Sequence, residues 1–511
     1  NQALLLKPNY AAAHYNIGNV LNMQGQLDVA IQSYKKAIQL QADYPDAYNN
    51  MGNALRDQGK LEDAIGAFEQ ALLIKPDYPE AYHNLGIALM DQGKLEEALN
   101  SFNKALSIQP HFSEAWSNGA QALEKWNKLE ELDHWLGRAL QVLGSAPPDI
   151  QFFQAKLLWR KKQYKKASQL IEAIDFDSIQ DIRKQDFLSL KAKCFEFMED
   201  FDKSYTYFKQ MNSLAKNSMD FLNFDADAYF MNAKDQLIKL KSRPLPTPET
   251  STLSNPSFSP VFLIGFPRSG TTLLDTILRS HSRIEVVEEK LNIDAAEIYL
   301  LTNGPFDFVK KPLPPEILLG SQKAYFTEFS KHVTKEHLKS VCIDKLPLNL
   351  LKIPLIRQLY PKAKYILALR HPMDTILSCW MQNFKLNAAM SNMVDLDRIV
   401  DLYCVAMETF RVCGSDFELD VHTIRYEDLL DDLSGETSKL LSFFNLAWEA
   451  QMEDYRATAL KRGRIHTPSY SQVVEPIYKD AQYRWLKYEK YLDKYLNQLD
   501  PWIKEFGYAE I

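Results

Sequence analysis

The sequence has little of what marks several large classes of protein. Only five of its 511 residues are cysteines, and no CxxC pair occurs among them, so neither a zinc site nor a disulfide framework is signalled. No apolar run approaches the roughly 18 residues that a membrane-spanning helix needs. Basic residues number 59 against 66 acidic ones, and the formal net charge of −7 argues against a broad nucleic-acid-binding surface. These absences leave a globular protein long enough for two or three domains.

The cysteines also bear on where the protein works. Small, scattered thiols are usually buried in the core. We expect all five to be reduced and most of them to be buried, which favours a cytoplasmic location. They are Cys194, Cys342, Cys379, Cys404 and Cys413.

The first half of the chain repeats itself. Gly18, Gly52 and Gly86 are 34 residues apart, and the segments around them superpose without gaps. Small residues recur at fixed positions after each glycine, and an aromatic residue stands at Tyr34 and its two equivalents. Since small positions let two helices approach closely and the aromatic ring fills the remaining gap, each unit is predicted to be a helical hairpin. The pattern resembles the tetratricopeptide repeat family.

This resemblance sets the extent of the first domain. Weaker copies continue to about residue 215, and a capping helix is expected near 224–241, so an all-α repeat solenoid is predicted over residues 1–242. The chain starts with Asn rather than Met, and QALLLKPNY, residues 2–10, matches the end of a repeat's second helix. We therefore expect at least one more half-repeat upstream in the natural protein.

One asparagine per unit keeps the 34-residue spacing even where other hallmarks fade. A column of side-chain amides can both donate to and accept from an extended peptide, so a protein or peptide is the predicted partner of the solenoid. The alternative is that asparagine is simply common and solvated at this repeat position. The column comprises Asn16, Asn50, Asn84 and Asn118.

A Pro-, Ser- and Thr-rich stretch predicts a linker over residues 243–260, and the second domain is predicted over 261–511. The linker leads into VFLIGF, which suits a buried strand, and then into PRSG and a helical TTLLDTIL. Gly265 and Gly270 fit the skeleton of a phosphate-binding loop, but Thr271 stands where such loops carry Lys. Hydrolysis of a nucleoside triphosphate is therefore disfavoured, whereas phosphate can still bind at the helix N-terminus.

The string FPRSGTTLLDTILRSH resembles the 5′-phosphosulfate loop of the sulfotransferases. About 100 residues later, KYILALRHPMDTILSCW resembles the element that binds the 3′-phosphate of 3′-phosphoadenosine-5′-phosphosulfate in that family. The resemblance implies an α/β, P-loop-like sulfotransferase domain with a mostly parallel sheet, that donor, and adenosine 3′,5′-bisphosphate as the product. It implies donor contacts from Pro267, Arg268, Ser269, Gly270, Thr271, Thr272, Arg370 and Ser378.

The choice of base follows the same resemblance. CIDKLPLN lacks the His that cytosolic sulfotransferases use, whereas IEVVEEKLNI is similar to the Glu-Glu string of protein-tyrosine sulfotransferases. By that match Glu289 is the base, with Glu288 as the fallback. Lys345 and Arg268 supply positive charge where negative charge develops, and no metal is called for.

The C-terminal part adds further donor contacts by resemblance. TIRYEDLL suggests Tyr426, and TPSYSQVVEPIYKDAQYRWLKY places Arg484 where the tyrosine-sulfating enzymes have Lys. Two departures are Tyr470, where those enzymes have a functional Ser, and Tyr483, which replaces a small residue. Ser469 or Ser471 is a substitute for that Ser. Gln472, Pro476 and Trp485 are in register with the family segment.

Together the two halves resemble bacterial tetratricopeptide-repeat sulfotransferases. The leading hypothesis is transfer of a sulfuryl group to an acceptor hydroxyl, with a protein tyrosine guided by the repeats as the acceptor. One alternative keeps the donor but uses a carbohydrate or small-molecule hydroxyl, with the repeats as a recruitment module. The non-enzyme alternative is a repeat scaffold with a decayed P-loop-like domain.

Overall fold

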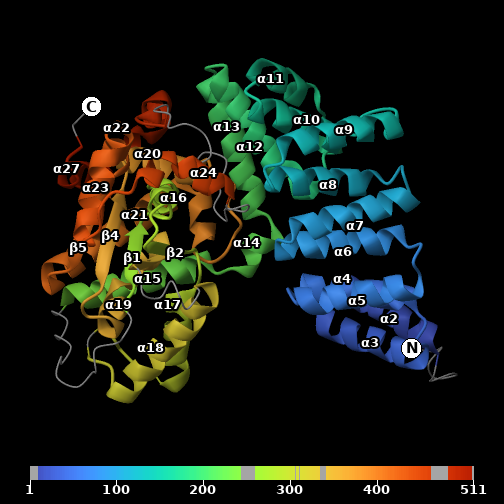
Figure 1. Ribbon diagram of the computed structural model, residues 1–511, viewed down its shortest axis with the longest axis horizontal. Helices are drawn as coiled ribbons and strands as arrows, with labels where there is room; N and C mark the ends of the chain where they lie inside the picture. The colour runs from blue at the N-terminus through green and yellow to red at the C-terminus, as the bar shows by residue number, and fades with distance from the viewer. Residues whose placement is uncertain are drawn as a thin grey trace. The chain divides into compact units, whose positions relative to one another are not determined.

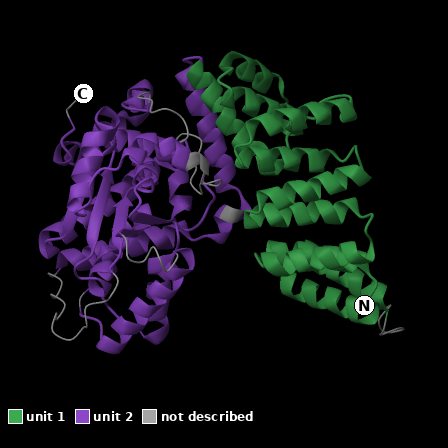
Figure 2. Ribbon diagram, viewed as in Figure 1, with its two compact units in different colours: residues 1–197 green, residues 198–511 purple. Residues whose placement is uncertain are grey.

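The fold is taken from a computed structural model (Figure 1). The chain folds into two compact units, residues 1–197 and residues 198–511 (Figure 2). The structure describes residues 10–242, 259–304, 306–309, 311–333, 341–461 and 481–508.

The first unit is a series of helical hairpins (Figure 1). Proline occupies the first position of three of its helices, where the missing N–H leaves no bond unmade. Its helices are α2 (Ala11–Met23), α3 (Leu27–Leu40), α4 (Pro45–Asp57), α5 (Leu61–Ile74), α6 (Pro79–Gln92), α7 (Leu95–Ile108), α8 (Ser113–Lys125), α9 (Leu129–Leu143), α10 (Pro148–Arg160), α11 (Tyr164–Ala173), the 3₁₀ turn η1 (Phe176–Ser178) and α12 (Asp181–Phe197).

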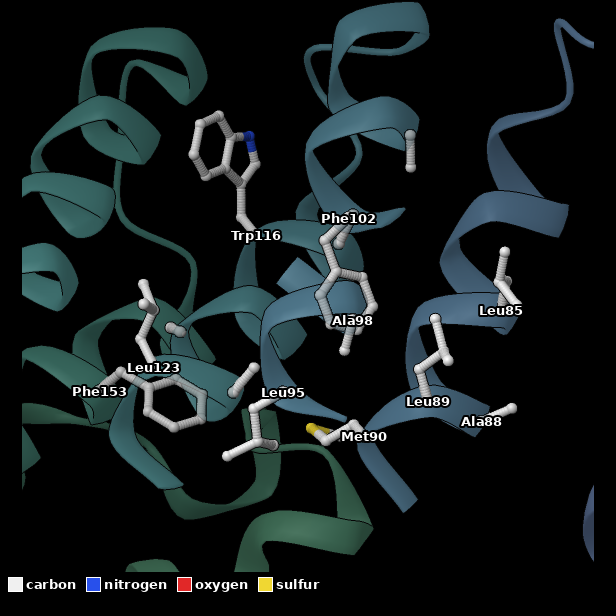
Figure 3. Close-up of a cluster of buried hydrophobic side chains, with 14 of the residues drawn as sticks. Leu85, Ala88, Leu89, Met90, Leu95, Ala98, Phe102, Trp116, Leu123 and Phe153 are labelled. Atoms are coloured by element: carbon white, nitrogen blue, oxygen red, sulfur yellow. The ribbon is translucent and has the colours of Figure 1, made fainter. Parts of the chain in front are cut away.

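The repeated glycines let paired helices touch. A Cβ placed on Gly52 would lie 2.6 Å from the ring of Phe68, and the fourth pair, Gly119 and Trp135, is closer still at 2.1 Å. The predicted close approach is therefore confirmed, and it persists in the unit whose other hallmarks have faded. Figure 3 shows side chains from successive helices, among them Leu89 and Phe102, in one continuous buried core.

The second unit contains a five-stranded parallel sheet in the order β2-β3-β1-β4-β5. Strand β1 is buried throughout, as expected for a strand covered on both faces. Ile264 of β1 pairs with Leu367 of β4. The strands are β1 (Val261–Gly265), β2 (Ile284–Glu288), β3 (Val341–Lys345), β4 (Lys364–Leu369) and β5 (Asp420–Arg425).

Helices and short 3₁₀ segments surround this sheet (Figure 1). The α-helices are α13 (Phe201–Lys216), α14 (Met219–Asn223), α15 (Ala226–Ser242), α16 (Thr271–Leu278), α17 (Asn292–Asn303), α18 (Pro315–Phe329), α19 (Ile353–Leu359), α20 (Pro372–Trp380), α21 (Leu396–Phe417), α22 (Tyr426–Asp431), α23 (Leu433–Phe443), α24 (Tyr455–Lys461), α26 (Glu489–Leu492) and α27 (Leu496–Glu505). The 3₁₀ segments are η2 (Ser330–His332), η4 (Pro347–Lys352), η5 (Met390–Val394), η6 (Ala450–Asp454), η7 (Arg484–Tyr488) and η8 (Asp493–Tyr495).

The predicted fold class, a repeat solenoid followed by an α/β domain with a parallel sheet, is confirmed. Helices α13 and α15, which the sequence assigned to the solenoid and its cap, pack within the second unit. Asn212 of α13 donates to the carbonyl of Trp380 at 2.8 Å, and Lys241 of α15 pairs with Glu408 at 2.5 Å. The linker falls almost wholly outside the described residues, so the domain boundaries from the sequence stay predictions.

Two smaller expectations concern the cysteines and the membrane. None of the five cysteines, all of which lie in the described ranges, forms a disulfide, and four of them are buried, as predicted. Across the described ranges, no helix combines the length and the apolar character that a membrane span requires.

Candidate active site at the carboxyl ends of the strands

Nearly all of the predicted catalytic and donor-binding residues stand where a strand of the sheet ends. Because all five strands are parallel, their carboxyl ends meet at one edge, which is where open α/β sheets bind ligands. The residues concerned are Pro267–Thr272 after β1, Glu289 after β2, Lys345 at the end of β3, Arg370 after β4 and Tyr426 after β5.

The loop between β1 and α16 is shaped by close contacts. Gly270 precedes the first turn of α16 with φ 92°, a left-handed conformation that glycine adopts without strain. A Cβ at this position would lie 2.6 Å from Cδ2 of Tyr426, so the ring packs directly on the glycine. The predicted loop and the predicted tyrosine are therefore in contact, and Thr271 and Thr272 open the helix with buried side chains.

The two predicted donor motifs also meet. Nε of Arg268 donates to Oγ of Ser378 on α20 at 3.1 Å, and Nη1 of Arg370 lies 3.4 Å from the carbonyl oxygen of Arg268. The Arg370 guanidinium stands 5.2 Å from the centroid of the Tyr426 ring. The carbonyl of Pro267 accepts from the Cys379 thiol at 3.1 Å. Residues more than 100 positions apart thus form one cationic corner beside the loop.

This corner fits an anionic ligand. Arg370 is 7% exposed and Ser269 is 2% exposed. Among the described residues, neither Nε of Arg370 nor Oγ of Ser269 has a hydrogen-bond partner. A buried guanidinium N–H and a buried hydroxyl without partners are unfavourable unless something accepts from them, and phosphate oxygens are suited to that.

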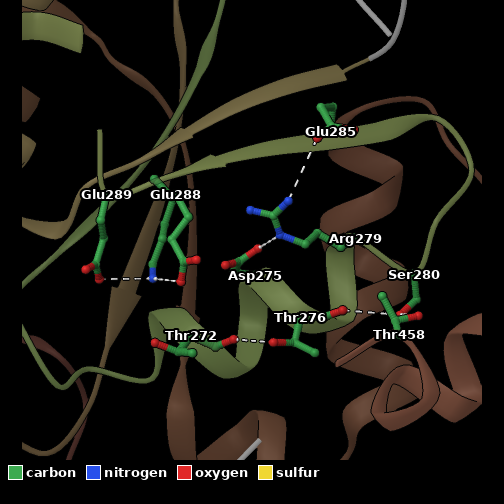
Figure 4. A network of polar contacts seen from close by, with 10 residues as sticks. Thr272, Asp275, Thr276, Arg279, Ser280, Glu285, Glu288, Glu289 and Thr458 are labelled. Atoms are coloured by element: carbon green, nitrogen blue, oxygen red, sulfur yellow. Dashed lines mark hydrogen bonds and ion pairs between the residues drawn. The ribbon is translucent and has the colours of Figure 1, made fainter. Parts of the chain in front are cut away.

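On the other side of β1, two carboxylates share one ammonium group. Nζ of Lys345 lies 3.2 Å from Oε1 of Glu288 and 3.3 Å from Oε1 of Glu289. The Lys345 side chain is fully buried, that of Glu288 is 3% exposed and that of Glu289 is 32% exposed. Figure 4 shows both glutamates with their dashed contacts at the end of β2. Glu289 takes a left-handed backbone, φ 49°, and its N–H donates to the Lys345 carbonyl at 2.8 Å.

The buried ammonium group of Lys345 stays protonated. Burial opposes the charge of Lys345, but the nearby carboxylates outweigh burial and raise its pKa above the usual value. The carboxylates are Glu288, Glu289 and Asp275, a buried residue of α16 that also pairs with Arg279 at 2.5 Å. Sequence reasoning missed Asp275, although its place on the loop helix, facing the sheet, was a usable signal.

The residues around Arg484 bind to Arg370 and to the start of α20. The backbone N–H groups of Tyr483 and Trp485 both donate to the carboxylate of Asp374 on α20, at 2.6 and 2.9 Å. Arg370 also donates to the carbonyl of Ala481 at 2.6 Å. Asp374 was another residue that sequence reasoning missed, and its only signal was an acidic side chain in the middle of the second donor motif.

Some predicted residues cannot be placed. Ser469, Tyr470, Ser471, Gln472 and Pro476 lie outside the described residues. In the part of the chain that the structure describes, no cluster of three or more His, Cys, Asp or Glu side chains is arranged to hold a metal ion.

The asparagine column forms a ladder within the repeats. Nδ2 of Asn50 donates to the Tyr15 hydroxyl at 3.0 Å, and Nδ2 of Asn84 donates to Oδ1 of Asn49 at 3.0 Å. Nδ2 of Asn118 lies 2.8 Å from a ring nitrogen of His83. These contacts link the first helices of successive hairpins, so the amides have a structural use, and a peptide-binding role stays a prediction. The first member, Asn16, is exposed.

Taken together, the fold and the site define an α/β domain with a phosphate-type loop, a cationic corner and a carboxylate–ammonium cluster on one sheet edge. Residues 260–450 match the model of the sulfotransferase family. Residues 18–56, 52–93 and 79–112 match models of the tetratricopeptide repeat. The chain thus combines tetratricopeptide repeats with a sulfotransferase domain.

Individual relatives are distant. An uncharacterized protein of Aquifex aeolicus (strain VF5) is 28% identical over 340 residues, covering 62% of this chain but only 42% of its own length. Protein-tyrosine sulfotransferase 1 of Danio rerio is 24% identical over 276 residues, 51% of this chain and 75% of its own. Cytosolic sulfotransferase 15 of Arabidopsis thaliana is 27% identical over 207 residues, 38% of this chain and 53% of its own.

Proposed function

We propose that this protein transfers a sulfuryl group from 3′-phosphoadenosine-5′-phosphosulfate to the hydroxyl of a protein tyrosine. The donor supplies an activated sulfuryl group, whose bond to the 5′-phosphate breaks as the bond to the acceptor oxygen forms. The phosphates would be held by the β1–α16 loop on one side and by Arg370, Ser378 and Arg484 on the other. Nε of Arg370 and Oγ of Ser269 support this assignment, because both are buried and neither has a hydrogen-bond partner within the described ranges.

The observation that carries the proposal is the cluster at the end of β2 and β3. Glu289 is the carboxylate of the pair that an acceptor can reach, since about a third of its side chain is exposed whereas Glu288 is almost wholly covered. Glu289 would take the proton of the acceptor hydroxyl. Lys345 and Arg268 would stabilise negative charge that develops on the oxygen of the leaving phosphate, since Arg268 belongs to the loop and Lys345 ends β3, the strand that pairs with β1.

Matched glutamate variants test the base. Transfer of labelled sulfate into a tyrosine peptide is measured at saturating donor. Glu289→Gln is expected to lower kcat by about 10²–10⁴-fold, which is the usual contribution of a general base. Glu288→Gln serves as the control of equal chemistry and is expected to lower kcat much less. Equal losses in both variants, or near wild-type turnover by Glu289→Gln, would exclude Glu289 as the base.

The names of the relatives suggest two classes of acceptor for the sulfuryl group. The Danio rerio relative is named a protein-tyrosine sulfotransferase, and the repeats offer a surface of the kind that binds extended peptides, which favours tyrosine. The Arabidopsis thaliana relative is named a cytosolic sulfotransferase, so a carbohydrate or small-molecule hydroxyl is the second candidate. A panel of peptides, glycans and small phenols, read by mass spectrometry, separates the two.

The role of the repeats is tested by deletion. Residues 1–197 form the first compact unit, and removing only these keeps α13 and α15, which pack within the second unit. If the repeats guide a peptide acceptor, this deletion raises the KM for that peptide and leaves transfer to a small phenol unchanged. If the deletion variant is as active as the full chain on the peptide and on the small phenol, guidance by the repeats is refuted.

A further inference from the structure

Residues 481–485 are fastened to the start of helix α20 by four contacts. The carboxylate of Asp374 accepts two of them, from the N–H groups of Tyr483 and Trp485 at 2.6 and 2.9 Å. Asp374 is 1% exposed, so solvent does not compete for these bonds. The third contact joins Nη2 of Arg370 to the carbonyl of Ala481 at 2.6 Å.

The fourth contact is a stack of rings. His371 and Trp485 lie with centroids 5.6 Å apart and planes within 10° of parallel. His371 is also held by Glu427: the backbone N–H of His371 donates to Oε1 of Glu427 at 2.9 Å, and the Tyr508 hydroxyl donates to Oε2 of the same carboxylate at 2.8 Å. Residues 481–485 therefore pack against buried residues that are themselves held by hydrogen bonds.

The local backbone suits this arrangement. Tyr483 has φ 53° and ψ 25°, a left-handed conformation that is uncommon for residues other than glycine. A left-handed residue within a turn makes nearby N–H groups converge on one anion. Here that anion is the Asp374 carboxylate, and Arg484 lies between the two donating residues.

We propose that Asp374 is a positioning residue for the donor: by binding the two N–H groups that flank Arg484, it fixes that cation beside Arg370 at the donor site. This inference rests on the proposed function, since it assigns Arg484 and Arg370 to the same donor. Asp374 does not contact the reacting atoms; it acts through the backbone on either side of Arg484.

Because Asp374 is charged, the proposal predicts whether donor binding becomes weaker or tighter when that charge is removed. Burial is the main cause that raises the pKa of Asp374 to about 6, with Glu427 raising it further and Arg370 and the two N–H groups lowering it. The neighbouring Tyr483 hydroxyl stays neutral because burial and carboxylates raise its pKa. At about pH 8 the carboxylate is ionised. If Asp374 acted only through its charge, it would repel the donor phosphates, and removing the charge would tighten donor binding. If Asp374 acts by positioning Arg484, removing the charge weakens donor binding.

The first test replaces the carboxylate by its amide. Asp374→Asn keeps one acceptor oxygen but turns an N–H donor toward a backbone N–H. At about pH 8 the variant is expected to bind adenosine 3′,5′-bisphosphate about tenfold more weakly by calorimetry, because a hydrogen bond to a charged group is lost. The donor KM should rise likewise, with kcat at saturating donor within about twofold of wild type, as expected for lost ground-state binding.

The control for this substitution is Asp395→Asn. Asp395 caps α21 and also accepts two backbone N–H bonds, from Asp397 and Arg398, but it pairs with Lys216 rather than with the donor side. Asparagine caps helices about as well as aspartate, so donor binding by this variant should equal that of wild type.

A second pair of variants serves if Asp374→Asn does not fold. Tyr483 is 37% exposed, so its side chain can be replaced without opening the core. Tyr483→Pro removes the N–H donor and forbids the left-handed backbone, and it should weaken donor binding about tenfold. Tyr483→Gly keeps both features and should bind the donor product within about twofold of wild type.

The outcomes separate this inference from the proposed function. If wild type binds adenosine 3′,5′-bisphosphate but Asp374→Asn and Tyr483→Pro bind it equally well or more tightly, the positioning role is wrong and the proposed function stands. If wild type itself shows no binding and no thermal shift, the donor assignment fails and this inference fails with it. Weakened binding in Asp374→Asn and Tyr483→Pro alone, with both controls intact, supports the proposal.

Discussion

The cluster around Lys345 makes a sharp prediction about stability. Lys345→Met fills the same space with an apolar chain but leaves the Glu288 carboxylate buried, 3% exposed, without its ammonium partner. Breaking one partner of a buried ion pair costs about 3–5 kcal/mol, because the remaining charge is uncompensated. At about 2–4 °C per kcal/mol for a unit of this size, the melting temperature of the second unit should fall by roughly 6–20 °C.

A second substitution shows whether the buried charge of Glu288 is the cause. Glu288→Gln, added to Lys345→Met, removes that charge and should recover at least half of the lost melting temperature. Calorimetry measures the shift, and hydrogen exchange of peptides from β2 and β3 locates it. The control is Lys439→Met, which breaks an exposed pair with Glu436 and should change stability by less than about 1 kcal/mol. If Lys345→Met melts within about 2 °C of wild type, or if Glu288→Gln fails to rescue it, the reasoning is refuted.

Three further predictions concern the repeats, the donor corner and pH. Gly52→Ala should destabilise the repeat array by about 1–3 kcal/mol because its Cβ meets Phe68 at 2.6 Å, whereas Gly66→Ala, whose Cβ meets nothing within 4 Å, should be neutral or stabilising in thermal unfolding. Arg370→Lys should weaken binding of adenosine 3′,5′-bisphosphate about tenfold or more in calorimetry, since lysine lacks the guanidinium fork, and unchanged affinity would contradict a direct phosphate contact. Burial raises the pKa of Asp344 to about 7, so the folded state keeps a proton that the unfolded state releases above about pH 4. The contribution of Asp344 to the free energy of unfolding should therefore fall as pH rises from about 4 to about 7. Asp344→Asn should remove this contribution, so its melting temperature should depend less on pH across this range.

What the sequence could predict was periodic or local. The 34-residue repeat contains its own packing rule, because the glycine and the aromatic residue that touch lie 16 positions apart within each unit, as in Gly52 and Phe68. The phosphate-type loop was equally visible, since its strand, turn and helix are contiguous in the chain. These features need no knowledge of distant contacts.

What the sequence could not predict depends on partners brought together by the fold. Asp374 meets Tyr483 across 109 positions, and nothing in the local pattern around either residue announces the contact. Helix α15 has an apolar face that demands a partner, but periodicity does not say which one, and the structure packs it on α21 rather than in the repeats. The shared ammonium of Lys345 is a similar case, because it becomes apparent only when β2 and β3 pair in register.

The strand order gives the site two sides with different expected effects. Strand β1 and its loop stand in the middle, Glu289 and Lys345 follow β2 and β3 on one side, and Arg370 and Tyr426 follow β4 and β5 on the other. Groups that hold the donor equally in the ground and transition states change KM, whereas groups that act only as charge develops change kcat. We therefore expect substitutions after β4 and β5 to raise the donor KM, and substitutions after β2 and β3 to lower kcat at saturating donor. Steady-state kinetics of one conservative variant per strand would reveal the division, and a kcat loss confined to the β4 and β5 side would show that the two roles are assigned to the wrong halves of the sheet.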